Sequence, residues 1–366
     1  MYQHDKRIVM TLDAGGTNFV FSAMSGYEEQ VQPYCLPSHA DQLERCLETL
    51  ISGFQHVQQQ LTEPAVAISF AFPGPADYQN GIIMDLPNMS AFKGGVALGP
   101  FLASHFQLPV FINNDGDLFA YGESIAGALP ELNRLLEASG NPKRYHNTLG
   151  FTLGTGFGGG IARNNDLYLG DNGAAGELWL LRHKNHRTVL LEEGVSIRAI
   201  QRVYRETSGD QRPLSPKDIY DIAEGTLDGD AQAARLSFEA FGENAGEGIA
   251  LVSTLLDGLV VLGGGIAAAR RYFMPALMSE LNGTINLVDG SPKPRLELTA
   301  FDLEDPDQKA AFLTPEVKHI PVPGTSEWVS FDPVKRLPVM FSTLGTSRAI
   351  AIGAYAFALR SLDTVK

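Results

Sequence analysis

The segment IVMTLDAGGTNFVFSAM at residues 8–24 decides the fold. An apolar run at residues 8–12 reaches the turn DAGGT at residues 13–17, and apolar side chains then alternate with their neighbours. This pattern is typical of two strands joined by a glycine turn. The second half of the chain opens in the same way, because an apolar run at residues 148–153 meets GTG at residues 154–156 before another short strand. The two openings look like copies and predict two α/β domains.

Beyond these openings, the spacing of apolar residues predicts the remaining elements. Helices are expected at residues 41–60, 196–205, 216–224, 230–256 and 344–359, and buried strands at residues 66–72, 110–112 and 259–262. A helix through Ala120 and Ile125 is expected after Asp115, which therefore falls between a strand and a helix. The triplet GGG at residues 263–265 likewise lies between a strand and an expected helix through Leu281. Residues 292–338 are rich in Pro, Asp and Glu with little periodicity, so we expect a surface insertion there.

The composition excludes several classes of function. The 366 residues are 44% hydrophobic, which suffices for two ordinary domain cores. A formal charge of −14 would repel a phosphate backbone, so nucleic acid is not expected as a partner. The apolar runs are too short for a signal peptide or a membrane span, and two cysteines, Cys35 and Cys46, are too few for a disulfide framework. We expect a cytoplasmic protein that does not contact the membrane.

The three glycine turns point to a nucleotide. Glycine lets backbone N–H groups approach phosphate oxygens that a side chain would hold away. Thr17 and Thr155 add hydroxyl donors, and the Asp13 carboxylate can hold Mg²⁺ through its water shell. A tight hairpin with positive φ explains each turn equally well when it is taken alone. Together, the turns favour a site for a nucleoside triphosphate.

A dinucleotide-binding motif is a competing interpretation of the second turn. Gly154, Gly156 and Gly159 match its spacing, and Glu177 lies close to the expected position of its ribose-binding acid. In the dinucleotide fold these glycines open a helix, whereas a β-prone segment and the turn NND at residues 164–166 follow here. We therefore reject this interpretation.

Five motifs in a fixed order resemble the ROK family of bacterial sugar kinases and repressors. They are LDAGGTN at residues 12–18, ND at 114–115, LGTGFGGG at 153–160, GAAGE at 173–177 and GGG at 263–265. The resemblance covers nearly the whole chain, and the ordered set is far more specific than any one motif. It implies an α/β actin-like ATPase fold, in which two ribonuclease H-like domains close over ATP·Mg²⁺ and a hexose in the cleft between them.

The domain limits that we expect follow this architecture. A small N-terminal domain would comprise residues 1–122 together with residues 346–366. A large C-terminal domain would comprise residues 123–345, including the insertion at about residues 292–338. We also expect the chain to form a homodimer.

The resemblance also implies roles for individual residues. Asp115 matches the base that deprotonates the attacking sugar hydroxyl, and Asn114 matches a residue that holds the sugar. An aspartate suits this role, because phosphoryl transfer depends on positioning and charge stabilisation more than on a strong base. Further sugar contacts are implied for Glu177, Glu192, Asn88 and Gly74, with Glu193 as an alternative to Glu192. The residues implied to bind the nucleotide and its Mg²⁺ are Asp13, Gly15, Gly16, Thr17, Asn18, Thr155, Gly156, Gly263, Gly264 and Gly265, with Asp13 serving the metal.

The chain departs from the family pattern after Glu177. Typical members place a histidine three residues later and then a Cys-x-Cys-Gly-x-x-Gly-Cys zinc motif, whereas this chain has Leu180 and no cysteine there. His183 and His186 lie among cations that disfavour a bound metal, so we expect no zinc. Loss of the histidine removes a donor to the sugar. A hexose other than glucose, or an amino sugar, is therefore a candidate substrate.

The expected function is phosphoryl transfer from ATP to a hexose hydroxyl, with O6 as the acceptor by analogy. A catalytically silent sugar- or nucleotide-binding regulator of the same fold is the first alternative, and retention of Asp13, Asp115 and both turns argues against it. An ATP hydrolase of the same superfamily is the second, and Asn114, Glu177 and Asn88 argue against that. A DNA-binding repressor is not expected, because only seven residues precede the first expected strand and the chain is acidic.

Overall fold

Two compact units make up the protein, and the computed structural model describes residues 1–84, 86 and 90–364. Unit 1 comprises Met1–Gly127, Gly160–Gly176 and Leu344–Lys366, and unit 2 comprises Ala128–Gly159 and Glu177–Thr343. Residues 160–176 thus group with unit 1, although they lie within the range expected for the larger domain. None of the described helices is long and apolar enough to cross a membrane.

A six-stranded sheet forms the centre of unit 1, in the order β3-β2-β1-β5-β8 with β4 paired to β2. Its strands are β1 (Ile8–Ala14), β2 (Asn18–Ser25), β3 (Glu28–Glu29), β4 (Tyr34–Pro37), β5 (Ala65–Ala71) and β8 (Val110–Asn113). The predicted hairpin of β1 and β2 is present, and β5 and β8 continue the sheet in parallel with β1. The carboxyl ends of parallel strands meet at one edge of a sheet. This edge therefore carries Asp13, the loop after β5 and Asn114.

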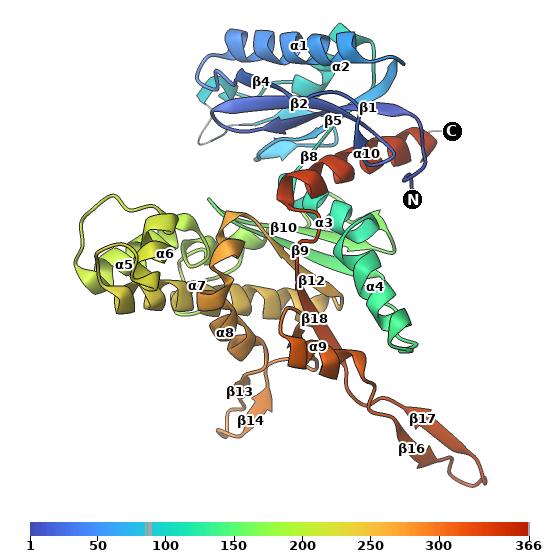
Figure 1. Cartoon of the computed structure of the whole chain (residues 1–366), viewed down its shortest axis with the longest axis vertical. Helices are drawn as coiled ribbons and strands as arrows, with labels where there is room; N and C mark the ends of the chain where they lie inside the picture. Colours follow the sequence, from blue (N-terminus) through green and yellow to red (C-terminus); the bar gives the residue numbers. More distant parts are fainter. Residues whose placement is uncertain (85, 87–89, 365–366) are drawn as a thin grey trace. The chain divides into compact units, whose positions relative to one another are not determined.

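Helices cover both faces of the unit 1 sheet (Figure 1). On one face lie α1 (Leu43–Gln60) and α2 (Leu98–Phe106), and on the other lies α10 (Thr346–Thr364), with α3 (Asp115–Ile125) packed against it. The alternation along β1 places Met10 in the core beneath α1 and Val9 in the core beneath α10. A side chain at Gly353 would overlap the carbonyl oxygen of Leu118, so glycine is what allows α10 and α3 to pack this closely.

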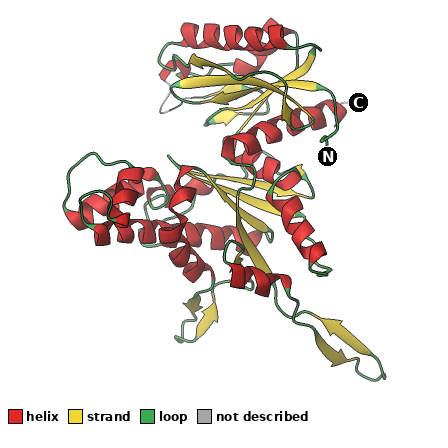
Figure 2. Ribbon diagram, viewed as in Figure 1, coloured by secondary structure: helices red, strands yellow, loops and turns green. Residues whose placement is uncertain are grey.

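A parallel sheet in the order β9-β12-β18-β15 forms the centre of unit 2 (Figure 2). Its strands are β9 (Asn147–Leu153), β12 (Leu259–Gly263), β15 (Thr299–Asp302) and β18 (Arg336–Phe341). The helices of this unit are α4 (Ala128–Ala138), α5 (Ile197–Ser208), α6 (Pro216–Glu224), α7 (Ala231–Leu255), α8 (Arg270–Leu281) and α9 (Pro306–Leu313). After the turn at residues 154–156, the first residues of β10 (Phe157–Arg163) also belong to this unit.

Short elements complete the two units. In unit 1 these are β6 (Ala76–Asp77), β7 (Ile82–Ile83), β11 (Asp166–Leu167) and the 3₁₀ turn η1 (Ser90–Phe92). In unit 2 they are the hairpin strands β13 (Thr284–Asn286), β14 (Pro292–Pro294), β16 (Lys318–Pro321) and β17 (Trp328–Phe331), and the 3₁₀ turns η2 (Leu178–Leu180), η3 (Leu191–Glu193) and η4 (Gly265–Ala269).

The expectation of a surface insertion over residues 292–338 is wrong for residues 299–313 and 336–338. Strand β15 and the start of β18 lie within it and pair with each other in the main sheet of unit 2. Ala300 on β15 and Phe312 on α9 are buried. These elements have only four and eight residues, which is too short to produce a periodic apolar pattern. Within residues 292–338, the strands that are exposed along their whole length are β14, β16 and β17.

Candidate active site

The turn between β1 and β2 has the tight geometry expected of a phosphate-binding turn. A Cβ atom on Gly15 would lie 2.8 Å from the carbonyl oxygen of Asn18, so the turn closes only with glycine at this position. Ser38 holds the other side of the turn, because its hydroxyl donates to the Gly16 carbonyl oxygen at 2.6 Å and its amide to the Thr17 carbonyl oxygen at 2.9 Å. Ser38 is buried, whereas Gly15, Gly16, Thr17 and Asn18 are exposed.

Asp13 is the exposed carboxylate at the end of β1. Within the described part of the chain its carboxylate has no hydrogen bond or ion pair, and its backbone pairs with Val20 of β2. Its oxygens are therefore available to a hard cation, which prefers oxygen ligands. The donor type fits the Mg²⁺ that accompanies a nucleoside triphosphate.

Asn114 and Asp115 stand at the start of α3, at the junction predicted from the sequence. The Asn114 side chain caps the helix, because its Oδ1 accepts a 2.8 Å hydrogen bond from the Gly116 amide. The Asn114 amide nitrogen donates to the Tyr78 hydroxyl at 3.4 Å, and Tyr78 in turn donates to the Phe72 carbonyl oxygen at 2.9 Å. Tyr78 thus links Asn114 to the end of β5.

The loop after β5 lies against the same tyrosine. A Cβ atom on Gly74 would lie 3.0 Å from the Tyr78 hydroxyl, so Gly74, Tyr78 and Asn114 form one cluster. The structure thereby brings two of the predicted sugar-binding residues together. A third, Asn88, lies outside the described residues.

The Asp115 carboxylate occupies the first position of α3. It accepts a 2.9 Å hydrogen bond from the Gly116 amide, and the positive end of the helix dipole favours a negative charge there. Desolvation by surrounding protein nevertheless raises the pKa of Asp115 above its ordinary value, and the negative charge of Asp13 adds to the rise. The residue keeps access to solvent, so this carboxylate can reach a ligand and accept a proton readily.

In unit 2 the glycine turn at residues 154–156 is held by a glutamate. Glu192 Oε2 accepts a 3.1 Å hydrogen bond from the Phe157 amide, and a side chain at Gly156 would overlap this carboxylate. Arg198 bridges Glu192 Oε1 at 3.0 Å and Glu193 Oε1 at 2.9 Å. Glu192, predicted as a sugar ligand, therefore lies directly against the turn that contains Thr155 and Gly156.

The triplet at residues 263–265 lies beside this turn. Gly264 has a φ of +93°, and a side chain there would overlap the backbone of Leu153, the last residue of β9. A Cβ atom on Gly265, in contrast, would meet no atom within 4 Å. The structure therefore brings two of the predicted nucleotide-binding segments together within unit 2.

Glu177 precedes the 3₁₀ turn η2, which packs against the turn η3 that carries Glu192. Its Oε2 accepts a hydrogen bond from the Trp179 indole N–H. Leu180, which replaces the histidine of the family pattern, is exposed. Both predicted sugar-binding glutamates thus stand on neighbouring turns of unit 2.

The histidine pair after η2 lacks the surroundings of a metal site. His183 is buried and its Nδ1 accepts a 3.1 Å hydrogen bond from the Asn185 amide. Burial lowers the pKa of His183, and the neighbouring His186 lowers it further. Among the described residues, no three His, Cys, Asp or Glu side chains gather as a metal site would require.

Four residues beside these clusters were not predicted from the sequence: Ser38, Tyr78, Trp179 and Arg198. Ser38 and Tyr78 act across 22 and 36 residues of chain, and no motif connects them to their partners. Arg198 binds the nearby Glu192 and Glu193 and also donates to the Thr155 carbonyl oxygen, 43 residues away. Trp179, two residues after Glu177, could have been noticed as a nearby donor. The sequence motifs therefore locate the backbone turns but not the side chains that support them.

Comparison with known proteins defines the class of protein. A crystal structure of glucokinase from Parabacteroides distasonis is 52% identical, covers 98% of this chain and 99% of its own, and superposes with a TM-score of 0.87. A ROK family glucokinase from Streptomyces griseus in complex with glucose and AMPPNP has the same fold, with 17% identity, a TM-score of 0.61 and coverage of 95% of this chain and 98% of its own. The fold is therefore the actin-like ATPase fold of sugar kinases.

A match to the sequence model of a protein family identifies the family of this chain. The ROK family model matches residues 9–306, so the chain belongs to the ROK family. Among curated relatives, N-acetyl-D-glucosamine kinase from Vibrio cholerae serotype O1 is 27% identical over 273 residues, which cover 70% of this chain and 83% of that protein.

Proposed function

We propose that this ATP-dependent sugar kinase of the ROK family phosphorylates the 6-hydroxyl of a hexose or a related sugar, with Asp115 as the catalytic base. The observation that carries the proposal is the placement of the Asp115 carboxylate. It is fixed at the first position of α3, it is accessible, and its pKa is raised. A base of this kind needs to accept a proton only as the hydroxyl attacks.

The reaction requires one bond to form and one to break. The sugar hydroxyl gives its proton to Asp115 while its oxygen forms a bond to the γ-phosphorus of ATP. The bond from that phosphorus to the bridging oxygen of ADP breaks, and ADP leaves with the electron pair. Catalysis then depends on alignment and charge stabilisation, to which the protein contributes by positioning.

The nucleotide is assigned to the glycine turns and the cation to Asp13. Exposed backbone N–H groups of Gly15 and Gly16, with the Thr17 hydroxyl and the neighbouring Asn18, are suited to phosphate oxygens. Nucleotide binding is proposed to be completed by five residues of unit 2: Thr155, Gly156, Gly263, Gly264 and Gly265. Mg²⁺ would neutralise phosphate charge when bound, and the free Asp13 carboxylate is the group proposed to hold it.

The sugar is assigned to Asn114, Gly74, Glu177, Glu192 and Asn88. Support comes from the links of Asn114 and Gly74 to Tyr78, and from the neighbouring turns that carry Glu177 and Glu192. Glu192 is preferred to Glu193, because the Glu192 carboxylate contacts the Phe157 amide, whereas the Glu193 carboxylate pairs with Arg198 alone among the described residues. Glucose and N-acetylhexosamines are the first substrates to test, since relatives are named for them.

We further propose that the protein acts in the cytoplasm as a homodimer and needs no zinc. Both cysteines are free thiols, and the described residues contain no cluster of metal ligands. Two cysteines are too few for a disulfide framework, which fits a reducing compartment.

The test is ADP release with ATP, Mg²⁺ and a panel of hexoses, aminohexoses and their epimers. At least one sugar should stimulate release, and NMR of the product should show the phosphate on O6. The 6-deoxy form of that sugar is the matched control and should bind without stimulating release. Sugar binding without ADP release across the panel would instead support the silent regulator.

A further inference from the structure

The β16–β17 hairpin exposes a set of large apolar side chains. All eight residues of its two strands are exposed, and Trp328 is 66% exposed. The register pairs Lys318 with Phe331 and Ile320 with Val329, so the apolar side chains at 320, 329 and 331 share one face. Figure 1 shows the hairpin projecting from the body of unit 2. We refer to residues 316–331 as the arm.

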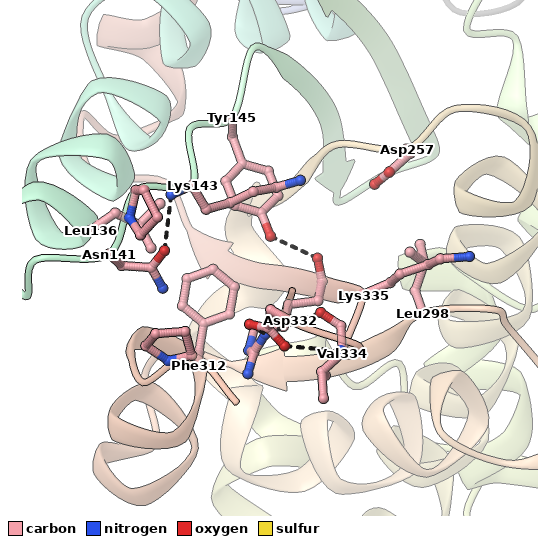
Figure 3. Close-up of a pocket in the computed structure, with 13 residues that line it drawn as sticks. Leu136, Asn141, Lys143, Tyr145, Asp257, Leu298, Phe312, Asp332, Val334 and Lys335 are labelled. Carbon is pink, nitrogen blue, oxygen red and sulfur yellow. Dashed lines mark hydrogen bonds and ion pairs between the residues drawn. The ribbon is translucent and has the colours of Figure 1, made fainter. Parts of the chain in front are cut away.

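The root of the arm adjoins a pocket whose lining includes Tyr145, Asp332 and Val334 (Figure 3). The Arg336 guanidinium pairs with Asp332 and donates to the Thr314 carbonyl oxygen at 3.1 Å, so it ties the two legs of the arm together. Its side chain is only 8% exposed. The Tyr145 hydroxyl donates to the Arg336 carbonyl oxygen at 2.8 Å, beside a cavity of about 380 Å³. These contacts hold the base of the arm against the body of unit 2.

The two edges of the arm differ. Strand β16 carries Lys318 and Pro321, and natural edge strands use lysine and proline to prevent further pairing. Strand β17 has the sequence WVSF, with neither a proline nor a charge. An isolated two-stranded ribbon is only marginally stable in water, and additional strands with an apolar face stabilise it. The open edge of β17 is therefore suited to pair with another strand.

The charge of the arm favours a second copy of this chain as the partner. The chain has a formal charge of −14, so most pairs of identical surfaces would repel each other. The arm contains one cation, Lys318, and two anions, Glu316 and Glu327, so its net charge is −1. A two-fold axis brings identical patches together. The arm offers a nearly neutral, apolar patch for that contact.

We propose that two copies of the chain associate through their arms, with β17 of one protomer pairing antiparallel with β17 of its partner. The two ribbons then form a four-stranded sheet in which the free backbone N–H and C=O groups of β17 are paired. Trp328 on one face, and Val329 and Phe331 on the other, come to lie beside side chains of the partner's β17. This assignment gives the proposed homodimer its interface and does not depend on the kinase chemistry.

The first test is sedimentation equilibrium of the full chain and of the variant Trp328→Glu/Phe331→Glu. The wild type should be a dimer, and the variant should dissociate with a dissociation constant raised roughly 30-fold or more, as for loss of interface aromatics. The matched control, Ile285→Ser/Val288→Ser, removes exposed apolar side chains from the β13–β14 hairpin and should remain dimeric. Both variants should keep their melting temperature and their sugar-dependent ADP release.

A second test locates the strand pair directly. In a Cys35→Ser background, which removes the exposed native thiol, single cysteines at positions 328–331 should include at least one that forms an intermolecular disulfide on mild oxidation. A cysteine at Val288 should not. A monomeric wild type, a variant that stays dimeric after loss of both aromatics, or the absence of any disulfide at 328–331 would each overturn the proposal.

Discussion

The Ser38 hydroxyl donates a 2.6 Å hydrogen bond to the carbonyl oxygen of Gly16, at the tip of the β1–β2 turn. Ser38 is buried and lies on the loop after β4, so it fixes the turn from outside the motif. Ser38→Ala should raise the KM for ATP by about threefold to tenfold, the effect of one net hydrogen bond. The matched control is Ser69→Ala on β5, because the buried Ser69 hydroxyl has no partner among the described residues. Equal KM values for both variants would contradict this role.

Gly264 and Gly265 should respond differently to alanine. Gly264→Ala places a side chain against the backbone of Leu153 at positive φ, so the melting temperature should fall, with a loss of about 1–3 kcal/mol of stability. Gly265→Ala meets open space and should keep its melting temperature while raising the KM for ATP. Thermal unfolding and initial rates measured on both variants test these two expectations. An unchanged KM for ATP in Gly265→Ala would contradict the placement of Gly265 in the nucleotide site.

Glu192 and Glu193 can be separated because they share Arg198 but only Glu192 reaches the glycine turn. Glu192→Ala should raise the KM for the sugar and lower the melting temperature, since the Phe157 amide loses its acceptor. Glu193→Ala removes only an exposed ion pair, which contributes little. If Glu193→Ala instead raised the KM more than Glu192→Ala, the assignment of the second sugar carboxylate would have to be reversed.

The raised pKa of Asp115 predicts a pH-dependent effect on stability. A carboxyl group with a pKa above its unfolded value binds its proton more tightly in the folded state, so folding is disfavoured as the pH rises through the folded pKa. Asp115→Asn should therefore raise the melting temperature at neutral pH and change it little below about pH 3.8, where the carboxyl is protonated in both states. A neutral-pH melting temperature below that of wild type would show that the charged form is stabilised instead.

Zinc removal should have no effect. Leu180 stands where the family pattern has a histidine, and the described residues contain no cluster of metal ligands. A zinc-selective chelator, added with excess Mg²⁺, should leave both melting temperature and ADP release unchanged, and elemental analysis should find no stoichiometric zinc. Unfolding on mild chelation with one zinc per chain would contradict the prediction.

The sequence predicts those parts of the fold in which local signals and burial agree. Helix α6 occupies residues 216–224 as predicted, because Ser215 caps its first turn and Gly225 ends it in a left-handed conformation. Strand β15 was missed, because four residues cannot show a period. Residues 299–302 form a strand because they pair with β18, and this contact exists only in the folded chain.

The same division applies to the candidate site. Asn114 and Asp115 are predictable because a strand-to-helix junction is a local feature with its own cap. Tyr78 and Ser38 are not, since their bonds to Asn114 and Gly16 depend on how β5 and β4 pack. Motifs specify where backbone must approach a ligand, whereas the supporting side chains are selected by tertiary packing.

The most direct test of the central claim is the rate of sugar-dependent ADP release by Asp115→Asn. The variant should fold and bind the sugar as wild type does. The asparagine side chain is nearly isosteric with aspartate, and Asn114 still caps α3. Its turnover should fall by about 10²–10⁴-fold, the range for loss of a positioned base. Turnover close to that of wild type, with the sugar still bound, would contradict the assignment of Asp115 as the base.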